Sequence, residues 1–107
     1  MSPYPMTDVI VQREYSFESP TGPMKVVVSL GKPAVMPDTP HRDWYCPFRV
    51  EGPDQDREFY AAGVDSVQAL LLGISSIRAH LLSISLRGKL TWHGHEDLNL
   101  ELIGNAV

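Results

Sequence analysis

The chain has 107 residues, 43% of them hydrophobic and 21% charged, a composition typical of one soluble globular domain. Nine Lys and Arg against thirteen Asp and Glu give a formal net charge of −4, and no basic run is present. Phosphate binding needs such a run, so we exclude nucleic acid as a partner. Cys46 is the single cysteine, which excludes the internal disulfides of a secreted scaffold.

The first thirty residues predict a flexible N-terminus followed by a β-hairpin. Residues 1–7 contain two prolines and no hydrophobic pattern, so we expect a flexible lead-in. Apolar and polar side chains alternate over 9–18 and again over 24–30, and the turn residues of 19–23 join the two runs. Arg13 interrupts the apolar side of the first run. That end of the strand is therefore expected at a sheet edge or near a partner.

Two further strands follow a long loop. Residues 31–43 contain three prolines, which predicts the loop. Side chains alternate again over 44–50, where Pro47 cannot donate to a ladder and predicts an edge strand or a bulge. A turn at 51–56 leads to a short fourth strand at 57–63.

The strongest local signal predicts one long helix after this strand. Asp65 is expected to cap the first turn, and Gln68, three positions later, completes a capping box. Apolar residues then repeat at spacings of three and four over about 19 residues. They are Val67, Leu70, Leu71, Ile74, Ile77, Leu81 and Ile84. After Gly88, residues 89–94 predict a last strand, and Leu98, Leu100 and Leu102 alternate near the end.

This order, β-β-β-β-α-β, predicts one α+β domain over residues 1–107. We expect an antiparallel sheet of four to five strands with one long amphipathic helix packed on one face. One helix is narrower than such a sheet, so part of the inner sheet face stays uncovered.

Two surfaces are candidates for binding a protein or a second copy of the chain. Ala69, Leu72, Ala79 and Leu82 are apolar but lie off the main stripe of the helix. Tyr45 and Tyr60 fall on the sheet face turned away from the helix. We predict partner binding at Tyr45, Tyr60, Leu72 and Leu82. The alternative is that they are ordinary surface apolar residues and cross-strand pairs.

The stretch TWHGHEDLNL, residues 91–100, holds the densest cluster of groups suited to chemistry. His93, His95 and Asp97 are candidate metal ligands, because zinc sites use His and carboxylate at short spacings. Gly94 instead favours a polar turn, and neither a third distant ligand nor a motif such as HExxH is evident. Cys46 alternates with aromatic residues, which predicts a buried thiol. We therefore expect no metal, no cofactor and no catalytic residue.

The compartment follows from what the sequence lacks. The N-terminus has no basic segment followed by an apolar run, so no signal peptide is expected. The longest apolar run, residues 69–74, is too short to span a bilayer. We expect a cytoplasmic protein that does not bind a membrane.

Two stretches resemble a known family. GVDSVQAL (63–70) and WHGHEDL (92–98) are similar to a GxDSxQAL helix start and a WxGxxDL tail in small bacterial proteins known only as a domain of unknown function. The resemblance spans residues 44–100 and implies no activity. It implies structural roles for Gly63, Asp65, Gln68, Trp92, Gly94 and Asp97. A weaker, topological similarity links the chain to HicB-like antitoxin domains.

Three functional hypotheses remain open at this point. The first is a non-enzymatic domain that binds a protein, with an immunity or antitoxin-like role in which the acidic surface meets a basic toxin. The second is a small-molecule or metal-binding enzyme centred on residues 92–97. The third is a homodimer with a structural or regulatory role.

Overall fold

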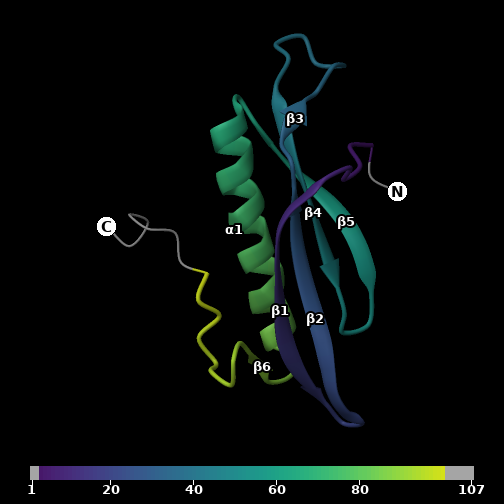
Figure 1. Cartoon of the computed structure of the whole chain (residues 1–107), viewed down its shortest axis with the longest axis vertical. Helices are drawn as coiled ribbons and strands as arrows, with labels where there is room; N and C mark the ends of the chain where they lie inside the picture. The colour runs from purple at the N-terminus through teal and green to yellow at the C-terminus, as the bar shows by residue number, and fades with distance from the viewer. Residues whose placement is uncertain (1–2, 101–107) are drawn as a thin grey trace.

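The computed structural model describes residues 3–100. Strand β1 (Val9–Ser19) and strand β2 (Gly22–Gly31) form the predicted hairpin and pair antiparallel over nearly their whole length. The register shifts between Val9 and Val11, so β1 is irregular near its start. Figure 1 shows the hairpin as the longest part of the sheet.

The remaining strands complete an antiparallel sheet. They are β3 (Ala34–Val35), β4 (Trp44–Glu51), β5 (Asp56–Gly63) and the short β6 (Leu90–Thr91). Across the sheet the order is β5-β4-β2-β1-β6, and β3 pairs with β4 on the same edge as β2. β3 lies inside the predicted loop 31–43, where sequence indicated no strand. β6 covers only part of the strand predicted over 89–94.

Pro47 predicted an edge strand or a bulge, and the structure shows that β4 is not an edge strand but has an irregular ladder beside Pro47. β4 pairs with β5 along one edge and with β2 and β3 along the other. Between the Leu30–Phe48 and Ala34–Tyr45 pairs the second ladder is interrupted, and Pro47 lies in that gap. Because a neighbouring ladder is already broken there, a residue without an N–H fits inside the sheet.

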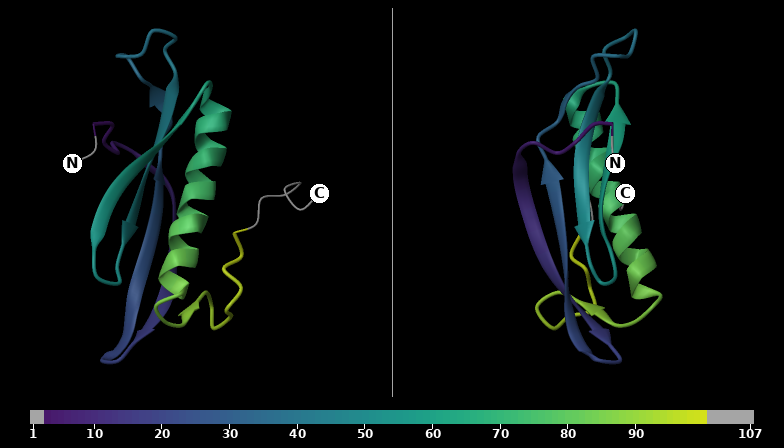
Figure 2. Two further views of the ribbon diagram at one scale, coloured as in Figure 1. Left: turned by 180° about the vertical axis from the view of Figure 1, so that it is seen from behind. Right: turned by 90° about the vertical axis from the view of Figure 1, so that its right-hand side faces the viewer.

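Helix α1 (Ser66–Ser85) packs on one face of this sheet, mainly over β4 and β5 (Figures 1 and 2). Asp65 is the N-cap, and its carboxylate accepts a hydrogen bond from the Gln68 N–H at 2.7 Å. The Gln68 side chain accepts from the Val64 N–H at 2.8 Å, one residue before the position that a capping box uses. The predicted fold class, an α+β antiparallel sheet with one helix on one face, is confirmed.

The buried face of α1 is rotated from the predicted stripe over its first two turns. Ala69 and Gly73 are buried there, whereas Val67 and Leu71 are 61% and 45% exposed. A Cβ atom on Gly73 would lie 3.1 Å from the Cys46 Sγ, so the helix backbone approaches β4 closely at this point. Larger side chains do not fit between the helix backbone and β4 at this point, so the larger apolar side chains of these turns point outward.

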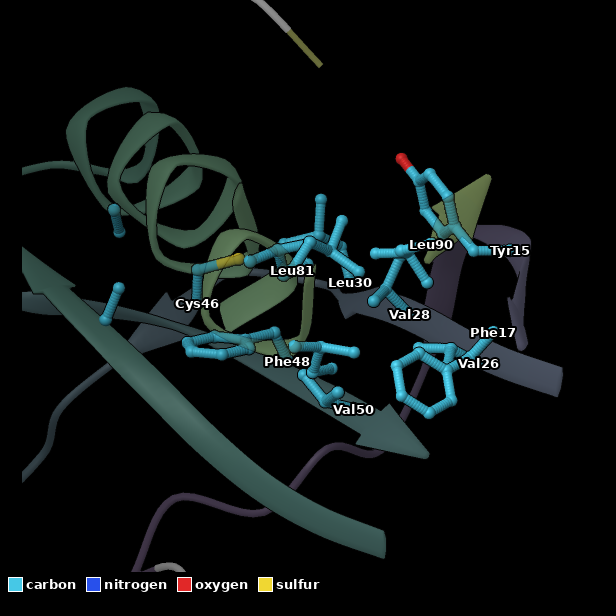
Figure 3. Close-up of a cluster of buried hydrophobic side chains, with 14 residues drawn as sticks. Tyr15, Phe17, Val26, Val28, Leu30, Cys46, Phe48, Val50, Leu81 and Leu90 are labelled. Carbon is cyan, nitrogen blue, oxygen red and sulfur yellow. The ribbon is translucent and has the colours of Figure 1, made fainter. Parts of the chain in front are cut away.

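The core lies between α1 and the inner sheet face. Its buried residues come from every long element: Tyr15, Phe17, Val26, Val28, Leu30, Cys46, Phe48, Val50, Ala61, Ala69, Ile77, Leu81, Ile84 and Leu90. Figure 3 shows Cys46 and Phe48 near Leu81 at one end of this cluster, and Tyr15 at the other. The alternation that predicted the strands therefore also predicted most of the core.

By length and composition α1 could cross a membrane. Its buried stripe, however, covers β4 and β5, and without it the apolar inner face of those strands would be bare. α1 thus contributes one face to the core, with 28% of its apolar window buried, and the compact domain is that of a soluble protein.

Candidate functional site

Residues 92–95 form a tight hairpin turn. The backbones of Trp92 and His95 exchange two hydrogen bonds, at 2.8 and 3.0 Å. The two residues between them, His93 and Gly94, have φ of +50° and +81°. Two successive residues with positive φ are the signature of a type I′ turn, which Gly favours at its second position. The turn that Gly94 favours therefore determines how the candidate metal ligands are arranged.

The candidate ligands do not converge with a further group. His93, His95 and Asp97 are all exposed. The His93 ring lies against the Trp92 ring, with centroids 4.5 Å apart, and the Asp97 carboxylate accepts a hydrogen bond from the Asn99 N–H at 2.9 Å. Among residues 3–100, no group of three His, Cys, Asp or Glu side chains is placed to hold a metal ion.

Arg13 anchors the segment that follows the turn. Its guanidinium donates to the backbone carbonyls of Asn99 at 2.7 Å and Leu98 at 3.4 Å, and lies 4.5 Å from the centre of the Trp92 ring. The Tyr15 hydroxyl donates to the same Leu98 carbonyl at 2.8 Å. Arg13 thus takes an apolar position of β1 because its guanidinium binds residues 98–99, which cross this end of the inner sheet face. Every residue has a backbone carbonyl, so the sequence does not show which carbonyls accept a hydrogen bond. Only the charged Arg13 at an apolar position indicated this contact.

Two hollows flank the open edge of β1. One, of about 260 Å³, is mainly apolar and is lined by Val11, Gln12, Arg13, Val28, Leu30, Ile74, Ile77 and Leu100. It is the part of the inner sheet face that α1 leaves uncovered. The other, of about 490 Å³, is lined by residues 12–16 of β1 and 91–94 of the turn. Arg13 lines both, but its guanidinium is already engaged by protein oxygens.

The predicted aromatic surface lies on the opposite sheet face, where a third tyrosine joins it. The Tyr4 ring lies 4.8 Å from both the Tyr45 and Tyr60 rings, and its hydroxyl donates to the Asp38 carboxylate at 2.6 Å. This hydrogen bond, followed by partial desolvation, raises the pKa of Tyr4 to about 12. Tyr45 is half-buried and Tyr60 is 39% exposed. Figures 1 and 2 place the N-terminal segment on the side of the sheet away from α1.

The outward side of α1 carries the other predicted partner residues. Leu72 and Leu82 are 43% and 42% exposed, and Leu86, the C-cap, is 88% exposed. Ala69, which the sequence grouped with them, is instead fully buried. Arg78 is the only Asp, Glu, Lys or Arg in the helix. A solvated helix face usually carries several charges, so this side is unusually apolar.

Burial shifts the pKa of two side chains, Cys46 and His80. Burial raises the pKa of the Cys46 thiol to about 11, which keeps it protonated and inert at neutral pH. The His80 ring packs against two stacked aromatic rings, with its centroid 4.4 Å from that of Phe59 and 5.7 Å from that of Phe48. Desolvation, with a smaller effect of the Arg57 charge, lowers the pKa of His80 below its ordinary value. Neither group sits beside a partner with which it could share a proton in catalysis.

These features define a class: a small single-helix α+β domain whose described residues include exposed apolar side chains and two hollows. Every deeply buried side-chain polar atom described has a hydrogen-bond partner. The chain belongs to the family DUF6968, a domain of unknown function, whose model matches residues 11–102. The match starts earlier than the predicted resemblance and takes in all of the sheet except the first two residues of β1. Searches of curated proteins and of solved structures returned no match.

Proposed function

We propose that this chain is a non-enzymatic protein-interaction domain. The observation that carries the proposal is the outward side of α1, where Leu72, Leu82 and Leu86 are exposed and no acidic residue interrupts them. Exposed leucines gathered on one side of a helix that carries few charges mark a candidate binding surface. A cytoplasmic, bacterial immunity or antitoxin-like role is the specific form that the net charge of −4 favours, because an acidic domain can neutralise a basic toxin.

Affinity capture with matched variants tests the proposal. The wild-type chain, Leu82→Lys and Val67→Lys are each immobilised and exposed to an extract of the source cell. Val67 is the control, because it is 61% exposed and lies off this side of the helix. We expect a specific protein on the wild type and on Val67→Lys, and at least tenfold less of it on Leu82→Lys. A wild-type chain that retains no protein, neither itself nor another, contradicts the proposal.

The toxin-neutralising form needs a separate test. A basic protein encoded beside this chain is expressed alone and together with it, and cell growth is measured. Growth arrest that co-expression relieves supports the antitoxin-like role. If no neighbouring protein is toxic, or if the toxicity persists on co-expression, that role is wrong while the interaction domain stands.

A further inference from the structure

The exposed residues of α1 follow a regular spacing. Gln68, Leu72, Ser75, Ala79, Leu82 and Leu86 are all exposed and are separated by four, three, four, three and four residues. At 3.6 residues per turn this spacing forms one straight seam. This is the spacing of the a and d positions through which two helices pack side by side, filled here by three leucines, one alanine and the polar Gln68 and Ser75. The buried stripe, centred on Gly73 and Ile77, lies on the opposite side of the helix.

We propose that this seam binds the same seam of a second copy, with the two α1 helices antiparallel. The inference rests on the proposed function and names its partner. In the antiparallel register centred on residue 77, Leu72 faces the partner's Leu82, and Ser75 faces the partner's Ala79. The two small residues at the centre allow the helices to approach closely, and the leucines close the seam on either side.

Charge selects the antiparallel arrangement over the parallel one. Asp65 lies at the start of α1, whereas Lys89 and Arg87, the latter ion-paired with Asp54 of the same chain, follow its end. Antiparallel packing brings the acidic end of one helix to the basic end of the other and aligns the two helix dipoles favourably. Parallel packing would place like charges together at both ends. Arg78 lies outside the seam by helical geometry and does not interrupt it.

The size of the seam sets the expected affinity. A helix of 20 residues is about 30 Å long, and one helix face is smaller than the roughly 800 Å² per partner of a standard interface. We therefore expect a micromolar, concentration-dependent dimer. Dimerisation would bury most of the apolar strip that the monomer exposes.

Sedimentation equilibrium from about 1 to about 500 μM of the full chain tests the inference. We expect the mass to rise from 11.9 kDa toward twice that value. Leu72→Glu and Leu82→Lys should each weaken dimerisation by roughly 30-fold or more, as for a buried hot-spot residue. The matched control, Val67→Lys, should dimerise like the wild type. Circular dichroism verifies that each variant folds.

The double variant Leu72→Glu/Leu82→Lys distinguishes the register. These positions lie about 15 Å apart along one helix, too far to pair within a chain, but each faces its opposite charge across the antiparallel dimer. We expect the double variant to recover most of the lost dimerisation. A wild-type chain that stays monomeric, or a folded double variant that does not recover, overturns the inference. If that monomer still captures another protein through Leu82, the proposed function survives without it.

Discussion

At the residue scale, Gly63 lies tightly against the backbone of α1. A Cβ atom placed there would lie 2.5 Å from the Ala69 backbone nitrogen, a distance that real Cβ atoms do not reach. We expect Gly63→Ala to lower the free energy of unfolding by about 2 kcal/mol or more, because a helix backbone cannot move aside as a side chain can. Chemical denaturation measures the change. The neighbouring Val64→Ala, at a position 72% exposed, should change it by less than about 0.5 kcal/mol.

The lowered pKa of His80 makes the stability of the fold depend on pH. Its pKa is lower in the folded chain than the ordinary 6.5, chiefly because burial among Phe48 and Phe59 disfavours the charged ring. Above about pH 6.5 this group costs nothing, because it is neutral in both states. As the pH falls below that value, the unfolded chain takes up a proton that the folded chain resists, and stability is lost.

The measurement is urea denaturation at several pH values between about 7 and 5.5, where Asp and Glu contribute little. We expect the wild type to lose stability on acidification and His80→Gln to lose distinctly less. Gln is the matched replacement, since it is polar but does not titrate. Equal slopes for the two chains would show that His80 is not the group responsible.

At the scale of single elements, the hairpin at 92–95 depends on its turn residues. Gly94 has φ of +81° and open space around its Cα, so a side chain there meets backbone strain and no clash. We expect Gly94→Ala to destabilise the chain by about 1 kcal/mol, the cost of a left-handed conformation. His93→Asn should be tolerated or slightly stabilising, because Asn-Gly is a favoured type I′ pair. Thermal unfolding of the two variants compares them directly, and a Gly94→Ala variant as stable as the wild type would contradict this account of the turn.

Helix α1 illustrates what periodicity can and cannot predict. The cap at Asp65 and the repeated apolar spacing predicted where the helix begins and that it packs on the sheet. They predicted the buried side over most of the helix but not over its first two turns, because Val67 and Leu71 fit the apolar pattern as well as Ala69 and Gly73 do. Which side is buried in those turns depends on how closely the helix backbone approaches β4. Small residues allow a close approach, but they indicate it only once the strand against which they pack is known.

At the scale of the whole molecule, local patterns predicted strands, helix and fold class, whereas contacts between distant segments escaped them. The position of Pro47 in a ladder gap depends on where β3 pairs, and β3 is two residues long. The anchoring of residues 98–99 by Arg13 depends on carbonyl groups that every residue has. For the candidate site, the sequence indicated the turn and the exposed leucines, but the seam emerged only after the buried side was known.

The N-terminal segment joins three parts of the fold. Tyr4 contacts Tyr45 of β4 and Tyr60 of β5, and its hydroxyl donates to Asp38 in the loop after β3. We expect these contacts to raise the pKa of Tyr4 from the ordinary value of 10 to about 12. Their stabilising effect is present below pH 10 and is lost as the pH rises from 10 toward 12, since the unfolded chain gives up the proton first.

Titration of the tyrosine rings by NMR tests this arrangement. We expect the Tyr4 resonance to titrate near pH 12 in the wild type and to move toward pH 10 in Asp38→Asn, because the hydrogen bond to the carboxylate is the largest cause of the raised pKa. Tyr60→Phe is the control, since it removes a ring contact and keeps that hydrogen bond. The sequence predicted that residues 1–7 are flexible, and a flexible segment would leave Tyr4 with an ordinary pKa. A Tyr4 that titrates near 10 in the wild type would therefore support flexibility over the packed segment.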